Sequence, residues 1–299
     1  MSGTVSIDVL ICTFRRASIR DTLQSIALQD VPGHIRLRVV VADNDDTPSA
    51  QSLIADMAGG FPHPLHYLHA PARNISIARN ACLDHATADW VAFIDDDETA
   101  PPGWIAALLA AAQESQTDAI FAPAIALYPQ NAPGWITARD YHSNIPVRRG
   151  GQVQTGHTCN ALLRWAGTAW ESTRFDLARG QSGGEDTAFF FAIARQGARF
   201  EASDTAPVHE HVAPARLTFG WLFRRKLRMG QSYAVAGVTR TGRAKLALAA
   251  LGKVLACTAM AMLHILSAES RNFWLLRGTL HLGVIAGVLS LPQPRAYGG

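Results

Sequence analysis

Residues 90–98 read WVAFIDDDE, an apolar run that ends in three aspartates and a glutamate. The run from Trp90 to Ile94 is short and uniformly apolar, which favours a strand buried on both faces. A carboxylate triplet directly after such a strand is costly unless a cation neutralises it. Asp95 and Asp97 are spaced i and i+2, so both can reach one hard cation. The segment therefore predicts a strand with an Mg²⁺ or Mn²⁺ site at its carboxyl end. An acidic turn that caps a following helix is the structural alternative.

Two earlier segments repeat this pattern of an apolar run followed by a polar cluster. Residues 5–13 lead into the sequence TFRR at 13–16, and residues 37–42 lead into the polar residues 43–46. Segments with helical spacing follow the runs, at 19–28, 51–57, 75–85 and 104–114. Strands that alternate with helices predict an α/β fold with a mostly parallel sheet and helices on both faces. Ligands of such sheets bind at the carboxyl ends of the strands, where these polar clusters fall.

Length and composition narrow the class of protein. With 299 residues the chain can form one large α/β domain and an appendage. A hydrophobic content of 48% and a mean hydropathy of +0.06 are high for a soluble enzyme and low for a multispan membrane protein. The net charge of +3 is too weak to indicate nucleic acid binding. The four cysteines lack metal-ligand spacing, so we expect reduced thiols and no structural zinc.

The order of five motifs resembles that of the inverting family 2 glycosyltransferases of the GT-A fold. Among these it is most similar to bacterial exopolysaccharide glucosyltransferases of the succinoglycan type. The motifs are ICTFRR at 11–16, VADND at 41–45, IARNA at 77–81, FIDDD at 93–97 and GGEDT at 183–187. The resemblance implies a GT-A catalytic domain over residues 1–235 and a membrane-associating helical tail over 236–299. The nucleotide-sugar half of the domain would cover about residues 1–125, and the acceptor half about 126–235.

The resemblance also implies roles for single residues of the first half. Asp95 and Asp97 would hold Mn²⁺ or Mg²⁺ and through it the diphosphate of a nucleotide-sugar. The nucleotide-sugar itself would be contacted by residues of four motifs, namely Thr13, Arg15, Asp43, Asp45, Arg79 and Asp96. Asp43 would accept from the uracil imide of a UDP-sugar, and its structural alternative is an Asx-turn after the strand. For Arg79 the structural alternative is an ion pair on a helix surface.

A second carboxylate pair, Glu185 and Asp186, follows two glycines and precedes an apolar helical pattern. Its structural alternative is a helix cap with favourable dipole energy. Inverting transfer needs one carboxylate that deprotonates the acceptor hydroxyl, and the resemblance implies that Asp186 is this base. Glu185 and Asn160 would then contact the acceptor sugar.

Two further segments have open alternatives. Alternation on a strand would point His209 and His211 to one face, and the resemblance implies that His211 completes the metal shell. Arg225 and Arg228 resemble a basic motif near the donor diphosphate. The same basic segment could instead form a juxtamembrane belt that faces anionic lipid.

Residues 246–267 and 273–291 are strongly apolar but contain Lys253, His264, Arg277 and His281. Charges at the centre of a spanning helix are expensive. Three arrangements therefore stay open: interfacial or re-entrant helices, a spanning hairpin, and soluble packing on the domain or on a second subunit. We expect a location at the cytoplasmic face of the bacterial inner membrane.

The predicted reaction is transfer of a hexose, with inversion, from a nucleotide-sugar to a lipid-linked or oligosaccharide acceptor. A sugar-phosphate nucleotidyltransferase is disfavoured, because residues 13–16 replace the glycine-rich loop that it needs after the first strand. A membrane-bound scaffold with a degenerate transferase domain is the non-enzymatic alternative. The sequence leaves the oligomeric state and the identity of the sugar open.

Overall fold

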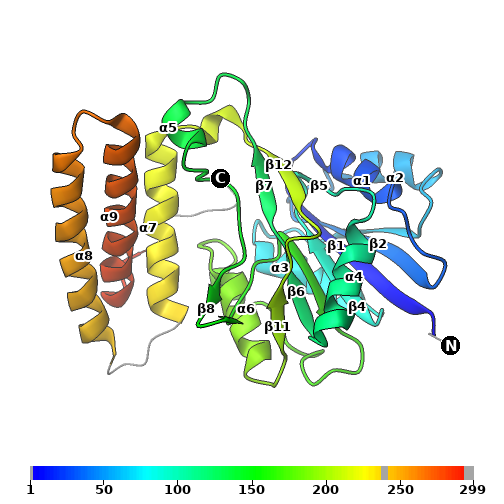
Figure 1. Ribbon diagram of the computed structural model, residues 1–299. Helices are drawn as coiled ribbons and strands as arrows, with labels where there is room; N and C mark the ends of the chain where they lie inside the picture. Colours follow the sequence, from blue (N-terminus) through cyan, green and yellow to red (C-terminus); the bar gives the residue numbers. More distant parts are fainter. Residues whose placement is uncertain (1–2, 237–241, 293–299) are drawn as a thin grey trace.

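The computed structural model describes residues 3–236 and 242–292, which form an α/β body with a layer of long helices beside it (Figure 1). The central sheet has seven strands in the order β11-β6-β10-β4-β1-β2-β3. Their bounds are β1 Val5–Thr13, β2 Ile35–Asp43, β3 Leu65–His69, β4 Trp90–Ile94, β6 Ala119–Phe121, β10 Asn160–Arg164 and β11 Phe200–Ala202. β1 pairs in parallel with β2 and β4, and β2 pairs in parallel with β3. The buried strand predicted at residues 90–94 is confirmed.

Alternation along β1 explains why helices cover both faces of the sheet. Ile7 and Val9 belong to a buried cluster with residues of the first helical layer, and Leu10 belongs to a second cluster on the other face. The first layer comprises α1 Ile19–Ala27, α2 Gln51–Ala58 and α4 Trp104–Ser115. The second comprises α3 Ile75–His85 and α6 Glu185–Ala194. This arrangement confirms the predicted α/β fold.

One strand runs against the others. β10 is antiparallel to β4 on one side and to β6 on the other, so the strand at residues 160–164 enters the sheet in the reverse direction. A second, three-stranded sheet has the order β5-β12-β7 and follows directly from the end of β4. The remaining short elements are β5 Glu98–Thr99, β7 Ala124–Leu127, α5 Gly134–Thr137, β8 Arg148–Arg149, β9 Gln152–Val153 and β12 Val208–His211.

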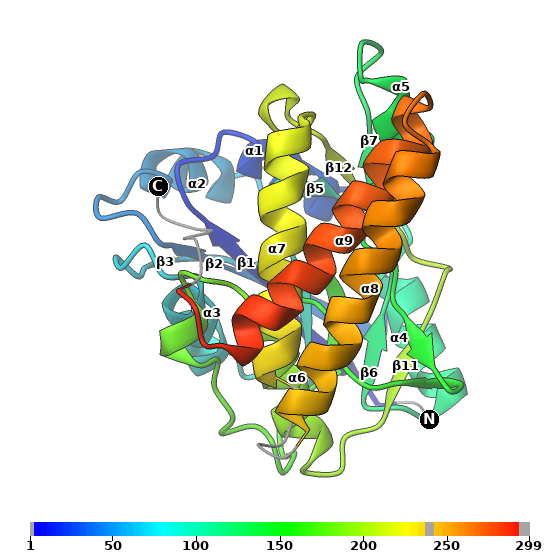
Figure 2. The ribbon, with the colours of Figure 1, turned by 90° about the vertical axis from the view of Figure 1, so that its left-hand side faces the viewer.

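Three long helices form the layer beside the sheet: α7 Phe219–Ala236, α8 Arg243–Leu263 and α9 Ala268–Val288. α9 lies between α7 and α8 in both views (Figures 1 and 2). Glycines permit the close approach of α7 and α9. A Cβ atom added to Gly283 would clash with the backbone of Leu227 and Gly230, and one added to Gly287 would clash with Gln231. The basic segment that contains Arg225 and Arg228 lies in α7, which follows a 3₁₀ turn at Pro214–Arg216.

The outer surface of this layer is apolar. Leu248, Leu255 and Leu266 are 74%, 63% and 99% exposed, and α8 is long and apolar enough to cross a membrane. Within the described ranges no other helix meets that criterion. The domain boundary placed at residue 235 falls at the end of α7, and it stays a prediction. The proposed tail also includes residues 237–241 and 293–299, which lie outside the described residues.

Candidate active site

The acidic cluster, Asp95 to Glu98, begins where β4 ends, and the parallel register brings the end of β1 beside it. Thr13 donates from Oγ1 to Asp96 at 2.8 Å. The backbone N–H of Asp95 donates to Glu98 at 2.8 Å. Asp96 and Glu98 are buried, whereas the side chains of Asp95 and Asp97 are 45% and 18% exposed. The two residues predicted to hold a metal are thus the accessible members of the cluster.

Asp97 is contacted by two arginines from distant parts of the chain. Arg16, in the loop after β1, places Nη1 3.0 Å from Asp96 and also forms an ion pair with Asp97. Arg216, in the turn before α7, places Nη2 3.3 Å from the same Asp97 oxygen. Its other nitrogen forms an ion pair with Glu210 on β12. Asp97 therefore has two guanidinium partners.

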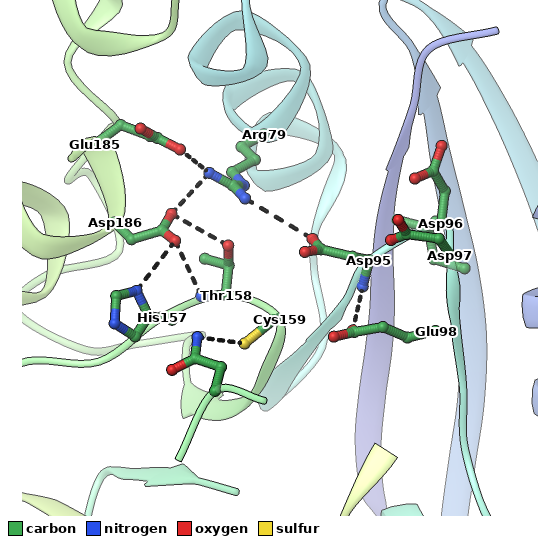
Figure 3. A network of polar contacts seen from close by, with 12 residues as sticks. Arg79, Asp95, Asp96, Asp97, Glu98, His157, Thr158, Cys159, Glu185 and Asp186 are labelled. Carbon is green, nitrogen blue, oxygen red and sulfur yellow. Dashed lines mark hydrogen bonds and ion pairs between the residues drawn. The ribbon is translucent and has the colours of Figure 1, made fainter. Parts of the chain in front are cut away.

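A third arginine, Arg79 on α3, joins the acidic cluster to the second carboxylate pair (Figure 3). Its Nη1 lies 2.6 Å from Glu185 and 2.7 Å from Asp186, and its Nη2 lies 3.8 Å from Asp95. The Arg79 side chain is 6% exposed and sits 5.5 Å from the centroid of the Phe175 ring. The helix-surface alternative for Arg79 is therefore wrong, because the guanidinium is buried between two carboxylate groups that are far apart in sequence.

Asp186 is held in its charged form. Burial acts to raise the pKa of Asp186, but Arg79 and His157 outweigh this effect and lower the pKa to about 2. Thr158 donates to the same carboxylate from Oγ1 at 3.1 Å and from its backbone N–H at 3.3 Å. The neighbouring Glu185 is 2% exposed, and burial raises its pKa against the effect of Arg79. The two adjacent carboxyls thus differ in their affinity for protons.

The chemistry of the acidic cluster fits a hard divalent cation. Loss of hydration raises the pKa of Asp95 to about 7, with Arg79 acting in the opposite direction and Asp97 adding to the rise. A divalent cation would stabilise the charged forms of Asp95 and Asp97. Asp95 and Asp97 would supply two oxygen ligands and leave other positions for diphosphate and water, as Mg²⁺ sites do. Over residues 3–236 and 242–292 no group of three or more His, Cys, Asp or Glu side chains is placed to hold a metal ion.

Asp43 has a structural environment. It is fully buried, and its carboxylate accepts from the backbone of Asp45 and Ala50 and from the Tyr67 hydroxyl. The hydrogen bond from the Asp45 backbone N–H forms the Asx-turn that was the structural alternative for Asp43. Both oxygens of Asp43 have partners within the protein, and its contact with uracil stays a prediction. Asp45, by contrast, pairs with the exposed Arg15 at 2.8 Å at the entrance of this edge.

Two further residues that the sequence predicted to bind ligands, Asn160 and His211, lie on the strands β10 and β12. The Asn160 side chain accepts from Trp104 and donates to two backbone carbonyls, and only 1% of the residue is exposed. Asn160 therefore links α4 to two loops, and its predicted sugar contact is not supported. On β12 the Glu210 side chain reaches toward Asp97 through Arg216. Among the described residues His211 forms no group with Asp95 and Asp97 that could hold a metal, and its metal contact stays a prediction.

The basic motif on α7 contributes one residue near the site. Arg225 lies 5.3 Å from the centroid of the Trp221 ring, and its charge acts on Glu210. Arg228 lies about one helical turn further along α7, half-buried, and its predicted diphosphate contact stays a prediction. At the end of α7, Ser232 packs on Gly184 at the start of α6, so the helical layer borders the pair Glu185 and Asp186.

Sequence reasoning missed Arg16, Arg216 and Glu210 as a connected group. The position of Arg16 directly after the polar end of a strand was a usable signal. Arg216 carries no such signal, because it lies 119 residues after Asp97 in an irregular turn and only the fold joins the two. The structure does bring together residues that the sequence had placed in four separate motifs, namely Thr13, Arg79, Asp95, Asp96, Asp97, Glu185 and Asp186.

Comparison with known proteins agrees with this geometry. Residues 8–166 match the family model for glycosyl transferase family 2. The chain is 42% identical to the succinoglycan biosynthesis protein ExoM of Rhizobium meliloti (strain 1021), over 99% of this chain and 96% of that protein.

Two solved structures share the fold at low sequence identity. A mannosyltransferase from Pyrobaculum calidifontis, PcManGT, in complex with GDP-Man and Mn²⁺, has a TM-score of 0.65 at 20% identity, covering 95% of this chain and 87% of that one. S. aureus TarS 1–349 in complex with UDP-GlcNAc has a TM-score of 0.54 at 13% identity, covering 93% and 92%. The predicted GT-A fold, with an apolar helical region at its C-terminal end, is confirmed. The chain belongs to glycosyl transferase family 2 and is a glycosyltransferase of the kind found in succinoglycan biosynthesis.

Proposed function

We propose that this glycosyltransferase transfers a hexose from a UDP-sugar to a lipid-linked or oligosaccharide acceptor, with inversion at the anomeric carbon. The observation that carries the proposal is the position of Arg79 between Asp95 and Asp186. A single guanidinium contacts both carboxylates, so the proposed metal-binding group and the proposed base lie close together. An acceptor hydroxyl and a donor diphosphate must meet near these two groups for direct displacement.

The residues have separate tasks in the transfer. The Asp186 carboxylate accepts the proton of the acceptor hydroxyl as its oxygen bonds to the anomeric carbon. The bond from that carbon to the diphosphate breaks, and its electron pair stays on the diphosphate oxygen. Mn²⁺ or Mg²⁺, held by Asp95 and Asp97, would supply positive charge to the leaving group. Arg79 keeps Asp186 charged and oriented before the acceptor binds.

We place the donor nucleotide at the edge formed by the ends of β1, β2 and β4. The support is geometric: Thr13 and Asp96 line this edge together with the ion pair of Arg15 and Asp45. Both structural neighbours described above were solved with nucleotide-sugars, one with GDP-Man and Mn²⁺ and the other with UDP-GlcNAc. For this chain UDP is our choice, and a screen of UDP- and GDP-sugars tests it.

We further propose that the enzyme works at the cytoplasmic face of a bacterial inner membrane, with α8 and α9 lying in the interface and facing anionic lipid. The exposed leucines of α8 favour contact with lipid. Lys253, Arg277 and His281 line a pocket of about 230 Å³ between α8 and α9. These groups lie near the middle of both helices, where they would meet the centre of the bilayer in a spanning hairpin. Their position favours interfacial helices over spanning ones.

The direct test is a donor screen that measures nucleoside diphosphate release with Mn²⁺, with and without membrane extract. We expect release from one UDP-hexose, stimulated by the extract and abolished by a chelator. NMR of the product should show the anomeric configuration opposite to that of the donor. Retained configuration would rule out single displacement, and binding of Mn²⁺–UDP without turnover of any donor would favour the scaffold alternative.

A further inference from the structure

Arg16 and Arg216 are unused by the mechanism above, although both contact the carboxylate that would hold the metal. Their guanidiniums approach the same Asp97 oxygen from the loop after β1 and from the turn before α7. We propose that Arg16 and Arg216 form a clamp for the donor diphosphate, and that Asp97 holds both guanidiniums ready until metal and nucleotide bind together. The inference rests on the proposed function and adds the residues that grip the leaving group.

Arg216 is held in place by contacts other than Asp97. Its Nη1 pairs with Glu210, and its guanidinium carbon lies 5.8 Å from the centroid of the Trp221 ring. The ring nitrogen Nε2 of His142 lies 3.2 Å from the Arg216 backbone oxygen. With these contacts Arg216 would stay beside the cluster after it releases Asp97. A guanidinium that is already oriented loses little entropy when a phosphate replaces the carboxylate.

The charges explain why the clamp would need the metal ion and the nucleoside diphosphate together. A divalent ion that binds Asp97 alone competes with two guanidiniums for one carboxylate, and it leaves like charges close together. A nucleoside diphosphate brings the negative charge that the metal and both guanidiniums then share. Guanidinium binds phosphate oxygens in a bidentate manner as readily as it binds carboxylate. The arrangement therefore predicts weak binding of metal alone and strong positive coupling between metal and nucleotide.

Both arginine side chains are partly exposed. The Arg16 side chain is 38% exposed and the Arg216 side chain 26%, so both can turn toward a ligand without opening the core. Arg216 directly precedes α7, which packs on α9 and, through Ser232, on Gly184 beside the base. Binding of the diphosphate would therefore link the sheet edge to the helical layer.

The test is calorimetric titration of the full-length protein with MnCl₂ alone and with UDP in saturating MnCl₂. In Arg216→Gln we expect Mn²⁺ alone to bind several-fold more tightly, because a competitor for Asp97 is gone. We expect Mn²⁺–UDP to bind about 10-fold more weakly, since one charge-assisted contact with the diphosphate is lost, at roughly 1.4 kcal/mol per tenfold. Arg16→Gln should show the same opposed pair of changes. Arg20→Gln removes an equal charge from the exposed surface of α1 and should change neither titration.

The clamp would be disproved if a variant changed both affinities, for Mn²⁺ alone and for Mn²⁺–UDP, in the same direction, or changed neither. A purely structural ion pair would not change the two affinities in opposite directions. If Arg216→Gln melts well below the parent in circular dichroism, Arg16→Gln decides the question. Failure of the proposed function looks different: the parent itself would bind no Mn²⁺–UDP, and Asp95→Ala would alter nothing. Failure of the clamp alone leaves parent binding intact and makes both arginine variants behave like Arg20→Gln.

Discussion

The acidic edge of the sheet and the α8–α9 hairpin both concentrate charge, but they balance it differently. At the sheet edge each of Asp95, Asp96 and Asp97 has an arginine partner. On the hairpin Lys253 and Arg277 converge on one pocket, and the described structure records no ion pair for either. In the first region the charges are balanced, so a cation and an anionic ligand that bind together can replace the existing ion pairs. The second keeps unbalanced positive charge beside an apolar surface, an arrangement that suits contact with anionic lipid.

The largest expected effect is at the base. Asp186→Asn should lower transfer by about 10²–10⁴-fold while donor binding persists, because a positioned general base contributes on that order. Single-turnover kinetics and UDP titration measure the two quantities separately. Asp84→Asn is the matched control, since Asp84 is an exposed carboxylate of α3 that pairs with Arg174. Equal loss in both variants would mean that the charge at Asp186 has no special part in the chemistry.

The metal carboxylates should respond next. Asp95→Ala and Asp97→Ala are each expected to abolish Mn²⁺-dependent UDP binding with little change in melting temperature, because both side chains lie at an accessible strand end. In the parent, EDTA should remove UDP binding and added Mn²⁺ should restore it. Tight metal-dependent binding of UDP by either variant would contradict the assignment of that residue.

The α8–α9 hairpin should control membrane binding without affecting the candidate active site. Leu255→Gln should reduce partition into vesicles that contain phosphatidylglycerol by several-fold, since burial of one leucine contributes about 1.5–3 kcal/mol at most. Leu28→Gln changes a comparably exposed leucine on the sheet body and should have no effect. High salt should release part of the parent protein if the helices lie in the interface. A full-length chain that is monodisperse without lipid or detergent would instead make the hairpin a packing or dimerisation element.

The smallest effect concerns the junction between the two regions. Gly283→Ala places a Cβ against the backbone of Leu227, and overpacking of this kind costs about 1–3 kcal/mol. The expected loss in melting temperature is roughly 2–4 °C per kcal/mol. Gly252→Ala on α8 meets open space and should keep or slightly raise the melting temperature. A Gly283→Ala variant as stable as the parent would show that α7 and α9 separate easily.

Much of the fold could be predicted from local pattern. The mainly apolar run at residues 5–13 and the uniformly apolar run at 90–94 identified β1 and β4, because strands buried on both faces admit few polar side chains. The polar ends of these strands located the candidate site, since parallel strands end at one edge. The motif order then identified the family, which the comparisons show.

The structure alone decided which side chains meet. Arg216 linked Glu210 on β12 to Asp97, and burial tied Asn160 to Trp104. Arg216 reached Asp97 across more than a hundred residues.

Sequence by itself determined the strands β1, β2 and β4 and the polar residues at their ends, because periodicity and residue type are local properties. Only the tertiary structure decided that Arg79 joins Asp95 to Asp186, and that two further arginines converge on Asp97. Long-range ion pairs leave no trace in local pattern. They depend on the register and crossing of elements, which packing of the whole chain sets.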